Sequence, residues 1–96
     1  MPFYAVLANW TEAGVRSVRD APARTEALRR AAEAAWGRVI SMLHTMGGYD
    51  VVVTLELPSD EAANLLMLRA GMQGFVRTTT LKGWSPDEFA ALVQKL

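Results

Sequence analysis

The sequence lacks cysteine altogether, and this absence excludes disulfide bonds and thiolate metal sites. Histidine occurs only once, at His44, and the carboxylates are scattered along the chain, so no set of metal ligands is apparent. Phosphate-binding loops, dinucleotide-binding glycine motifs and nucleophile elbows are also missing. We therefore expect neither a bound metal nor an organic cofactor.

An excess of charge of one sign is missing as well, because ten basic and ten acidic residues cancel. Without a basic run, the sequence gives no reason to expect nucleic acid as a partner. The N-terminal segment lacks the charged region and cleavage site of a signal peptide, and no apolar run approaches the roughly 20 residues of a membrane span. These absences predict a soluble, cytoplasmic protein with no membrane partner.

Apolar residues, by contrast, are plentiful. The chain has 96 residues, of which 51% are hydrophobic, and this predicts one domain spanning residues 1–96. A domain of this size buries a limited share of its surface, so pairing with further copies is a natural way to bury more. We expect a homodimer or a higher homo-oligomer.

Periodicity and end signals predict seven main elements and a short helical turn capped by Thr11. Strands are expected over residues 2–9, 38–45, 50–57 and 75–84. Long helices are expected over residues 20–37 and 59–72, and a closing helix over 85–96. This order predicts an α+β, ferredoxin-like βαββαβ fold with an added C-terminal helix. Right-handed crossovers then give a four-stranded antiparallel sheet in the order 4-1-3-2, with both long helices on one face.

The two long helices differ in how their side chains are distributed. The first has one apolar stripe, formed by Leu28, Ala31, Ala32, Ala35 and Trp36. Its charged residues are interpreted as a solvated face, formed by Arg24, Arg29, Arg30 and Glu33. The second helix is apolar over most of its circumference, which predicts burial on more than one side, the second cover being another subunit.

A hairpin with Gly47 and Gly48 as its loop fixes the expected register of the middle strands. One face then pairs Met46 with Tyr49, His44 with Val51, Met42 with Val53 and Ile40 with Leu55, and we place this face under the helices. The other face is mixed in polarity and carries Val39, Ser41, Leu43 and Thr45 against Glu56, Thr54, Val52 and Asp50. Such a face commonly packs against a second copy, which gives a dimeric α/β barrel whose interior or helix–sheet cleft can accept a small molecule.

Three stretches, "NWTEAGV", "GGYDVVVTLELPSDEAA" and "VRTTTLKGWSPDEF", together resemble the GYD domain family, which is named for the Gly48-Tyr49-Asp50 segment. The resemblance covers essentially the whole chain. It implies a ferredoxin-like fold of the dimeric α/β barrel superfamily, and it implies no activity because the family is largely uncharacterised. The Gly-x-Tyr-Asp pattern at a strand start is also similar to the effector-binding domain of the leucine-responsive regulators, in which small ligands bind at subunit interfaces. No helix-turn-helix half accompanies it here, so direct regulation of DNA is not expected.

Six residues are candidates for a ligand-binding site at or near a subunit interface: Trp10, His44, Tyr49, Asp50, Arg77 and Thr79. The aromatic rings of Trp10 and Tyr49 would form walls. Arg77 would anchor an anion, while His44 and Asp50 would make polar contacts. No metal ligand is among them.

Each candidate also has a structural interpretation. His44 can be a hydrogen-bonded core or edge histidine, and Thr79 can reflect the preference of threonine for strands. Asp50 can accept hydrogen bonds from loop amides, and Tyr49 can anchor the turn. Arg77 can pair with an acid such as Glu56, and Trp10 can fill a core or an interface.

Three functions fit these residues. The first is binding of a small organic molecule by a homo-oligomer. The second is a cofactor-independent enzyme of the monooxygenase, isomerase or decarboxylase kind, in which His44 moves a proton and Asp50 orients it. The third is a structural assembly module without a site. A fold that hosts many functions does not choose between them.

Overall fold

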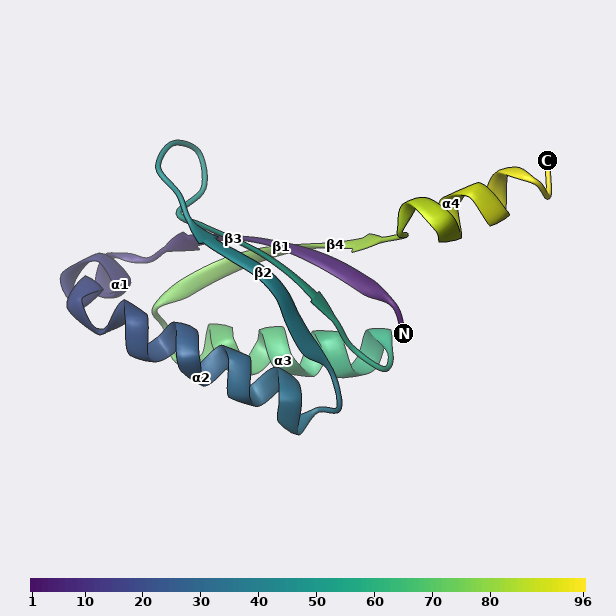
Figure 1. Ribbon diagram of the computed structural model, residues 1–96. Helices are drawn as coiled ribbons and strands as arrows, with labels where there is room; N and C mark the ends of the chain where they lie inside the picture. Colours follow the sequence, from purple (N-terminus) through teal and green to yellow (C-terminus); the bar gives the residue numbers. More distant parts are fainter.

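The computed structural model describes residues 1–96 as a four-stranded antiparallel sheet with two long helices on one face (Figure 1). The strands are β1 (Phe3–Trp10), β2 (Arg38–His44), β3 (Val51–Glu56) and β4 (Val76–Gly83). The helices are α1 (Glu12–Arg16), the 3-10 turn η1 (Val18–Asp20), α2 (Ala21–Ala34), α3 (Asp60–Met72) and α4 (Pro86–Val93). The strand order β2-β3-β1-β4 confirms the predicted order 4-1-3-2. No helix combines the length and the apolar character that crossing a membrane requires.

Capping side chains begin the helices where the sequence predicts. Thr11 accepts a hydrogen bond from the Gly14 N–H at the start of α1. Ser59 accepts one from the Ala62 N–H at the start of α3. Ser85 and Glu88 form a reciprocal capping box at the start of α4. These local bonds satisfy amide groups that would otherwise lack partners, and so they fix where each helix begins.

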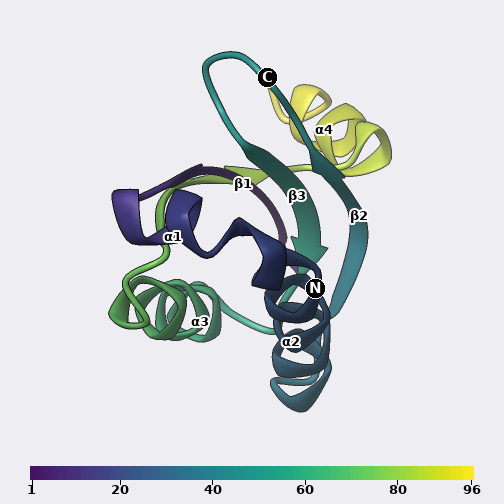
Figure 2. The ribbon, with the colours of Figure 1, turned by 90° about the vertical axis from the view of Figure 1, so that its left-hand side faces the viewer.

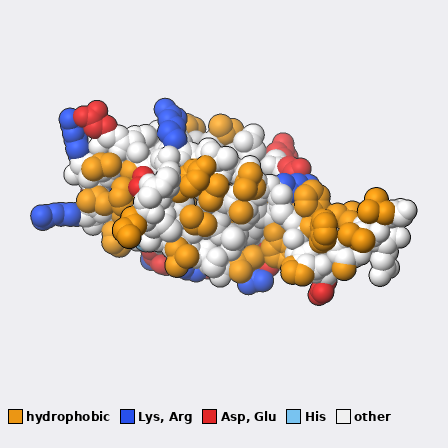
Figure 3. Space-filling model, turned by 90° about the horizontal axis from the view of Figure 1, so that it is seen from above, with side chains coloured by type: hydrophobic (Ala, Val, Ile, Leu, Met, Phe, Trp, Pro, Cys, Tyr) orange, Lys and Arg blue, Asp and Glu red, His pale blue; other side chains and the backbone are white.

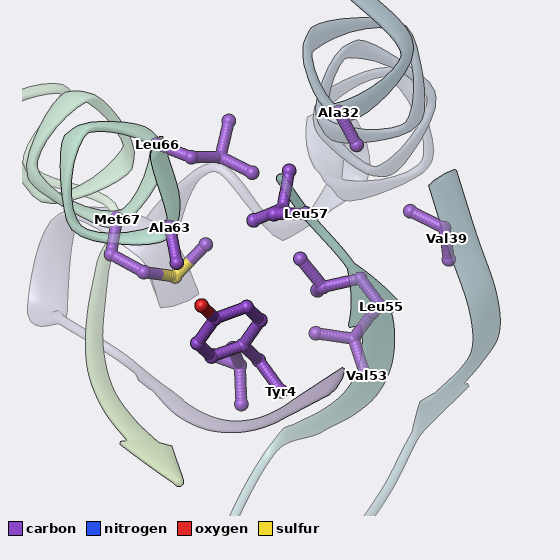
Figure 4. Close-up of a cluster of buried hydrophobic side chains, with 10 residues drawn as sticks. Tyr4, Ala32, Val39, Val53, Leu55, Leu57, Ala63, Leu66 and Met67 are labelled. Atoms are coloured by element: carbon purple, nitrogen blue, oxygen red, sulfur yellow. The ribbon is translucent and has the colours of Figure 1, made fainter. Parts of the chain in front are cut away.

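The core lies between the sheet and the two long helices. Figure 2 shows the sheet curving over α2 and α3, which lie on its concave side. Ten buried side chains make up the core (Figure 4): Tyr4, Val6, Ala32, Val39, Val53, Leu55, Leu57, Ala63, Leu66 and Met67. Only the face of α3 that carries Ala63, Leu66 and Met67 is buried within one chain, so the predicted second cover of this helix stays a prediction.

The register of β2 against β3 is partly as predicted. His44 lies opposite Val51 and Met42 opposite Val53, both as expected. The predicted placement of Met46 under the helices is wrong, because the ladder ends at the His44–Val51 pair and Met46 is 97% exposed. The pairing predicted for Ile40 is wrong, because a β-bulge makes Ile40 an extra residue and places Val39 opposite Leu55. Val39 is therefore the buried residue, and Ile40 is 42% exposed.

The end of α2 also differs from the prediction, because the helix ends at Ala34 and Trp36 leaves the apolar stripe. Trp36 adopts a left-handed φ of 67° and is 85% exposed. The Trp36 N–H donates to the Glu33 carbonyl at 3.0 Å, and the Gly37 N–H donates to the Ala32 carbonyl at 2.9 Å. This is the pattern of a Schellman motif, with tryptophan at the position that usually holds glycine. Glycine is required at the next residue, Gly37, because a Cβ there would collide with the Glu56 carbonyl oxygen at the end of β3.

Candidate functional site

A cleft of about 250 Å³ lies between α2, α3 and the concave face of the sheet. Twenty-one residues line it, and fifteen of them are hydrophobic. The six polar ones are Arg24, Thr25, His44, Arg69, Gln73 and Thr78. This composition, an apolar wall with a few polar groups, is typical of small-molecule sites, and the volume lies just below their usual range of roughly 300–1,000 Å³.

Small side chains on the two helices leave the space open. Ala27 and Ala31 of α2 face Ala70 of α3 across the cleft, while Val6 and Val53 form its floor on the sheet. Larger residues at the alanine positions would close the gap between the helices. The cleft therefore follows from the alanine content of α2 as much as from the fold.

Arg24 turns into this cleft and corrects the prediction that it belongs to a solvated face. Its guanidinium lies over the Phe75 ring, 4.4 Å from the centroid, and Nη1 donates to the Ser17 carbonyl at 3.3 Å. The prediction holds for Arg29 and Arg30, whose guanidinium groups pair with Glu26 on the exposed side of α2. The sequence carried a usable signal, because Arg24 lies four residues before Leu28 and so falls on the apolar stripe.

His44 lines the cleft from β2, as does Trp10 from the end of β1. The His44 Nε2 lies 3.0 Å from the Thr25 Oγ1, a hydrogen bond between the sheet and α2. Thr25 was not foreseen as a partner, because contacts between a strand and a helix far apart in sequence leave no local pattern. The bond orients the imidazole at the edge of the cleft.

Asp50 holds the ends of two strands together beside the cleft. Its Oδ2 accepts a hydrogen bond from the Trp10 backbone N–H at 2.9 Å, and its own N–H donates to the Ala8 carbonyl at 2.9 Å. Tyr49 is exposed in the hairpin loop, where its carbonyl accepts a bond from the Thr45 hydroxyl. The Asp50 carboxylate thus accepts a backbone amide bond from strand β1 and not from the loop, and only the backbone of Tyr49 contributes a bond to the turn. No hydrogen bond joins Asp50 to His44.

Arg77 and Thr79 lie opposite Asn9 and Leu7, on strand positions whose side chains alternate with the cleft-facing ones. They belong to the open face of the sheet and do not meet Trp10 or His44 in the cleft of one chain. The acid suggested as a partner for Arg77 is taken, because Glu56 pairs with Arg38 at 2.6 Å. The six candidates therefore divide between the two faces of the sheet and the hairpin.

Comparison with known proteins gives the family of the chain. A family model described as the GYD domain matches residues 4–93. The chain belongs to the GYD domain family. The match runs from β1 into α4, so it includes both long helices and every residue of the candidate site. No match was found among curated proteins.

Two solved structures resemble this GYD domain in fold. One is the crystal structure of FFRP-DM1, with a TM-score of 0.62 and 17% identity over 88% of this chain and 100% of that chain. The other is TTHA0845 from Thermus thermophilus, with a TM-score of 0.55 and 22% identity over 88% of this chain and 95% of that chain. At these identities the likeness concerns the fold alone.

A second polar cluster in the GYD domain lies at the opposite end of the core from the cleft residues of α2. The buried Tyr4 hydroxyl donates to the Asp60 Oδ1 at 2.6 Å, and the Lys82 Nζ lies 3.0 Å from the same oxygen. Burial, reinforced by the hydrogen bond and the charge of Asp60, raises the pKa of Tyr4 to about 12. Hydrogen bonds from Tyr4 and Lys82 lower the pKa of Asp60. Figure 4 shows the Tyr4 ring within the core, among side chains of β3 and α3.

This cluster predicts a loss of stability in alkali. Because folding raises the pKa of Tyr4 from 10.0 to about 12, its stabilising contribution is complete below pH 10 and is lost as the pH rises toward 12. Because folding lowers the pKa of Asp60, its contribution is present above its ordinary range and is lost as the pH falls through the folded-state value. Ultraviolet titration of tyrosinate is expected to show one of the two tyrosines ionising near pH 12. The Tyr4→Phe variant should lack this step, and its persistence in the variant would contradict the assignment.

Proposed function

We propose that this GYD domain is a homo-oligomer that binds a small organic molecule in the cleft between α2, α3 and the sheet. The observation that carries the proposal is the cleft itself, in which fifteen apolar residues surround a few convergent polar groups. Trp10 supplies part of the wall, and His44, oriented by Thr25, supplies a polar contact. Asp50 acts through the Trp10 backbone, which it holds in place.

The open face of the sheet supports self-association. It carries apolar side chains that nothing in the chain covers, among them Leu43 and Leu81. Figure 3 looks onto this side of the molecule, and hydrophobic side chains are spread over the sheet and continue onto α4. Two such faces packed together would form the dimeric α/β barrel and would bring Arg77 and Thr79 into its interior.

Helix α4 gives a second reason to expect a partner. It projects beyond the end of β4 and away from α2 and α3 (Figure 1), and all its residues are exposed. Its apolar residues Phe89, Leu92 and Val93 recur at the spacing of one helix face. A second copy packed on the open sheet face would contact α4, and the apolar face of α4 would be buried against that copy. Sedimentation equilibrium is expected to give a multiple of 10.5 kDa, and a single-chain mass would remove this part of the proposal.

The contacts of His44 favour binding over catalysis. A general base of the kind expected for an enzyme is normally oriented by an acid within hydrogen-bond reach. Here His44 bonds to Thr25, and Asp50 is occupied by the Trp10 N–H. The enzyme interpretation therefore has less support from the site than simple binding.

A variant that fills the cleft tests the binding function. Ala27 and Ala34 are both exposed alanines of α2, but Ala27 lines the cleft and Ala34, two turns further along the helix, does not. Ala27→Phe is expected to weaken binding of the neutral fluorescent probe N-phenyl-1-naphthylamine by at least about tenfold, because the ring occupies the space of the probe. Ala34→Phe, the matched control, should bind the probe as the unaltered chain does. Equal binding by both variants, or no binding by the unaltered chain, would refute a ligand site in the cleft.

A further inference from the structure

We infer that the cleft recognises a small apolar molecule bearing one carboxylate, and that Arg24 is the group that binds the carboxylate. The inference rests on the proposed ligand-binding function and adds the chemical class of the ligand. It combines three features of the site: the balance of charge around it, the incomplete hydrogen bonding of Arg24, and the apolar surface that surrounds this arginine.

The charge around the cleft is one-sided although the chain as a whole is neutral. Arg24 and Arg69 both line the cleft, and none of its 21 lining residues is an aspartate or a glutamate. The ion pairs of the structure use Arg16, Arg29, Arg30, Arg38 and Lys82. The two cationic side chains at the cleft are therefore without an acidic partner, and an anionic ligand would supply the opposite charge.

Arg24 has a donor left over. Its Nη1 reaches the Ser17 carbonyl at 3.3 Å, a long bond, while its Nη2 is buried and has no acceptor. A buried charged donor without an acceptor is unfavourable, and this cost is relieved by any group that provides one. A carboxylate offers two oxygens in the plane of the guanidinium fork, which is the geometry that arginine binds best. Because Nη2 is enclosed, the guanidinium of Arg24 must rotate within the cleft so that this nitrogen reaches the ligand.

The surroundings of Arg24 select the rest of the ligand. The stacking of its guanidinium on Phe75 holds the charge at an apolar surface, where it is poorly hydrated and hydrogen bonds are strong. Beyond it the cleft is walled by apolar side chains such as Leu28 and Met67. A molecule with a single charged end and an apolar body fits this division, whereas a strongly hydrated, multiply charged ligand does not.

A matched pair of ligands tests the inference. Dissociation constants of 2-naphthoate and 2-naphthamide, which differ in charge and hardly in shape, are measured for the unaltered chain and for Arg24→Met. The unaltered chain is expected to bind the carboxylate at least about tenfold more tightly, the effect of hydrogen bonds to a charged group. Arg24→Met keeps a long side chain over Phe75 but should bind both compounds about equally. Arg29→Met, on the exposed side of the same helix, should keep the preference.

The outcomes separate the inference from the function on which it rests. If the unaltered chain binds both naphthyl compounds equally, or if folded Arg24→Met keeps the preference, the carboxylate assignment is overturned while the cleft remains a binding site. If N-phenyl-1-naphthylamine and both naphthyl compounds fail to bind, the proposed function itself fails. Should Arg24→Met melt before it can be assayed, Arg24→Lys provides the second variant. It keeps the charge, loses the fork and should show a preference between those of the other two chains.

Discussion

Replacing Gly37 with alanine is expected to destabilise the GYD domain by about 2–4 kcal/mol, which corresponds to a melting temperature roughly 10–20 °C lower. A Cβ at this position would lie 2.1 Å from the Glu56 carbonyl oxygen and 2.7 Å from the Leu57 Cδ2. The first of these contacts is with backbone, so the start of β2 would have to move away from β3. Leu57 is fully buried in the core, and the displacement would spread into it. Thermal unfolding followed by circular dichroism measures the effect.

Gly71 provides the control for this substitution within the same chain. It lies inside α3, and a Cβ there would meet nothing within 4 Å. Gly71→Ala is therefore expected to raise stability by about 0.5–1 kcal/mol, the usual gain from alanine in a helix interior. If Gly37→Ala and Gly71→Ala melted at the same temperature, the close approach of β3 to Gly37 would be wrong.

Replacing Leu81 with aspartate is expected to separate the proposed oligomer into folded monomers, with an association constant lowered by at least about 100-fold. Leu81 lies on β4 opposite Ala5 of the central strand, and it is 51% exposed in the single chain. A carboxylate in place of Leu81 would lose its hydration and remove an apolar contact between the two packed faces. The substitution should cost the single folded chain little stability, because in the monomer this side chain is in contact with water. Sedimentation equilibrium gives the mass, and circular dichroism gives the fold.

Val15→Asp is the matched control for the Leu81 variant. Val15 is 56% exposed on α1, on a helix that is not part of the open face, so the substitution adds the same charge elsewhere. It should leave the mass of the oligomer unchanged. Dissociation by both substitutions would point to a general effect of charge, and dissociation by neither would place the interface away from the open sheet face.

The fold was predictable because its signals are local and agree with one another. Thr11, Ser59 and Ser85 each stand directly before a helix, and each caps it as expected. Because crossovers are right-handed, the order of strands and helices along the chain allows few sheet topologies. The observed strand order is the one predicted from it. Gly47 lies in the connection between β2 and β3 as expected, with a positive φ of 109° that glycine adopts without steric cost.

The departures occur where tertiary contacts override a local pattern. The bulge at Ile40 shifts the register by one residue, and a period of two cannot reveal where an extra residue will be inserted. Trp36 continues the helical spacing of apolar residues, yet the chain leaves the helix there because Gly37 has to pass close to Glu56. In both cases the neighbouring strand β3 decides the outcome.

The candidate site was predicted only in part for a similar reason. Trp10 and His44 line the cleft as predicted. The charge of Arg24 predicts a solvated side chain, but its position on the apolar stripe places it at the cleft. Its partner Phe75 is distant in sequence and carries no motif. The polar groups that complete a cleft come from different elements, and only the fold brings them together.

The position of β1 has a consequence for how the chain is made. This first strand pairs with β3 on one side and with β4, the last strand, on the other, so Trp10 pairs with Val76 and Phe3 with Gly83. During synthesis, the backbone groups on one edge of β1 stay unpaired until β4, residues 76–83, has left the ribosome. Pairing between residues so distant in sequence slows folding, and the unpaired edge of β1 can meanwhile form hydrogen bonds with other chains. Synthesis is therefore the stage at which this small protein is most exposed to aggregation.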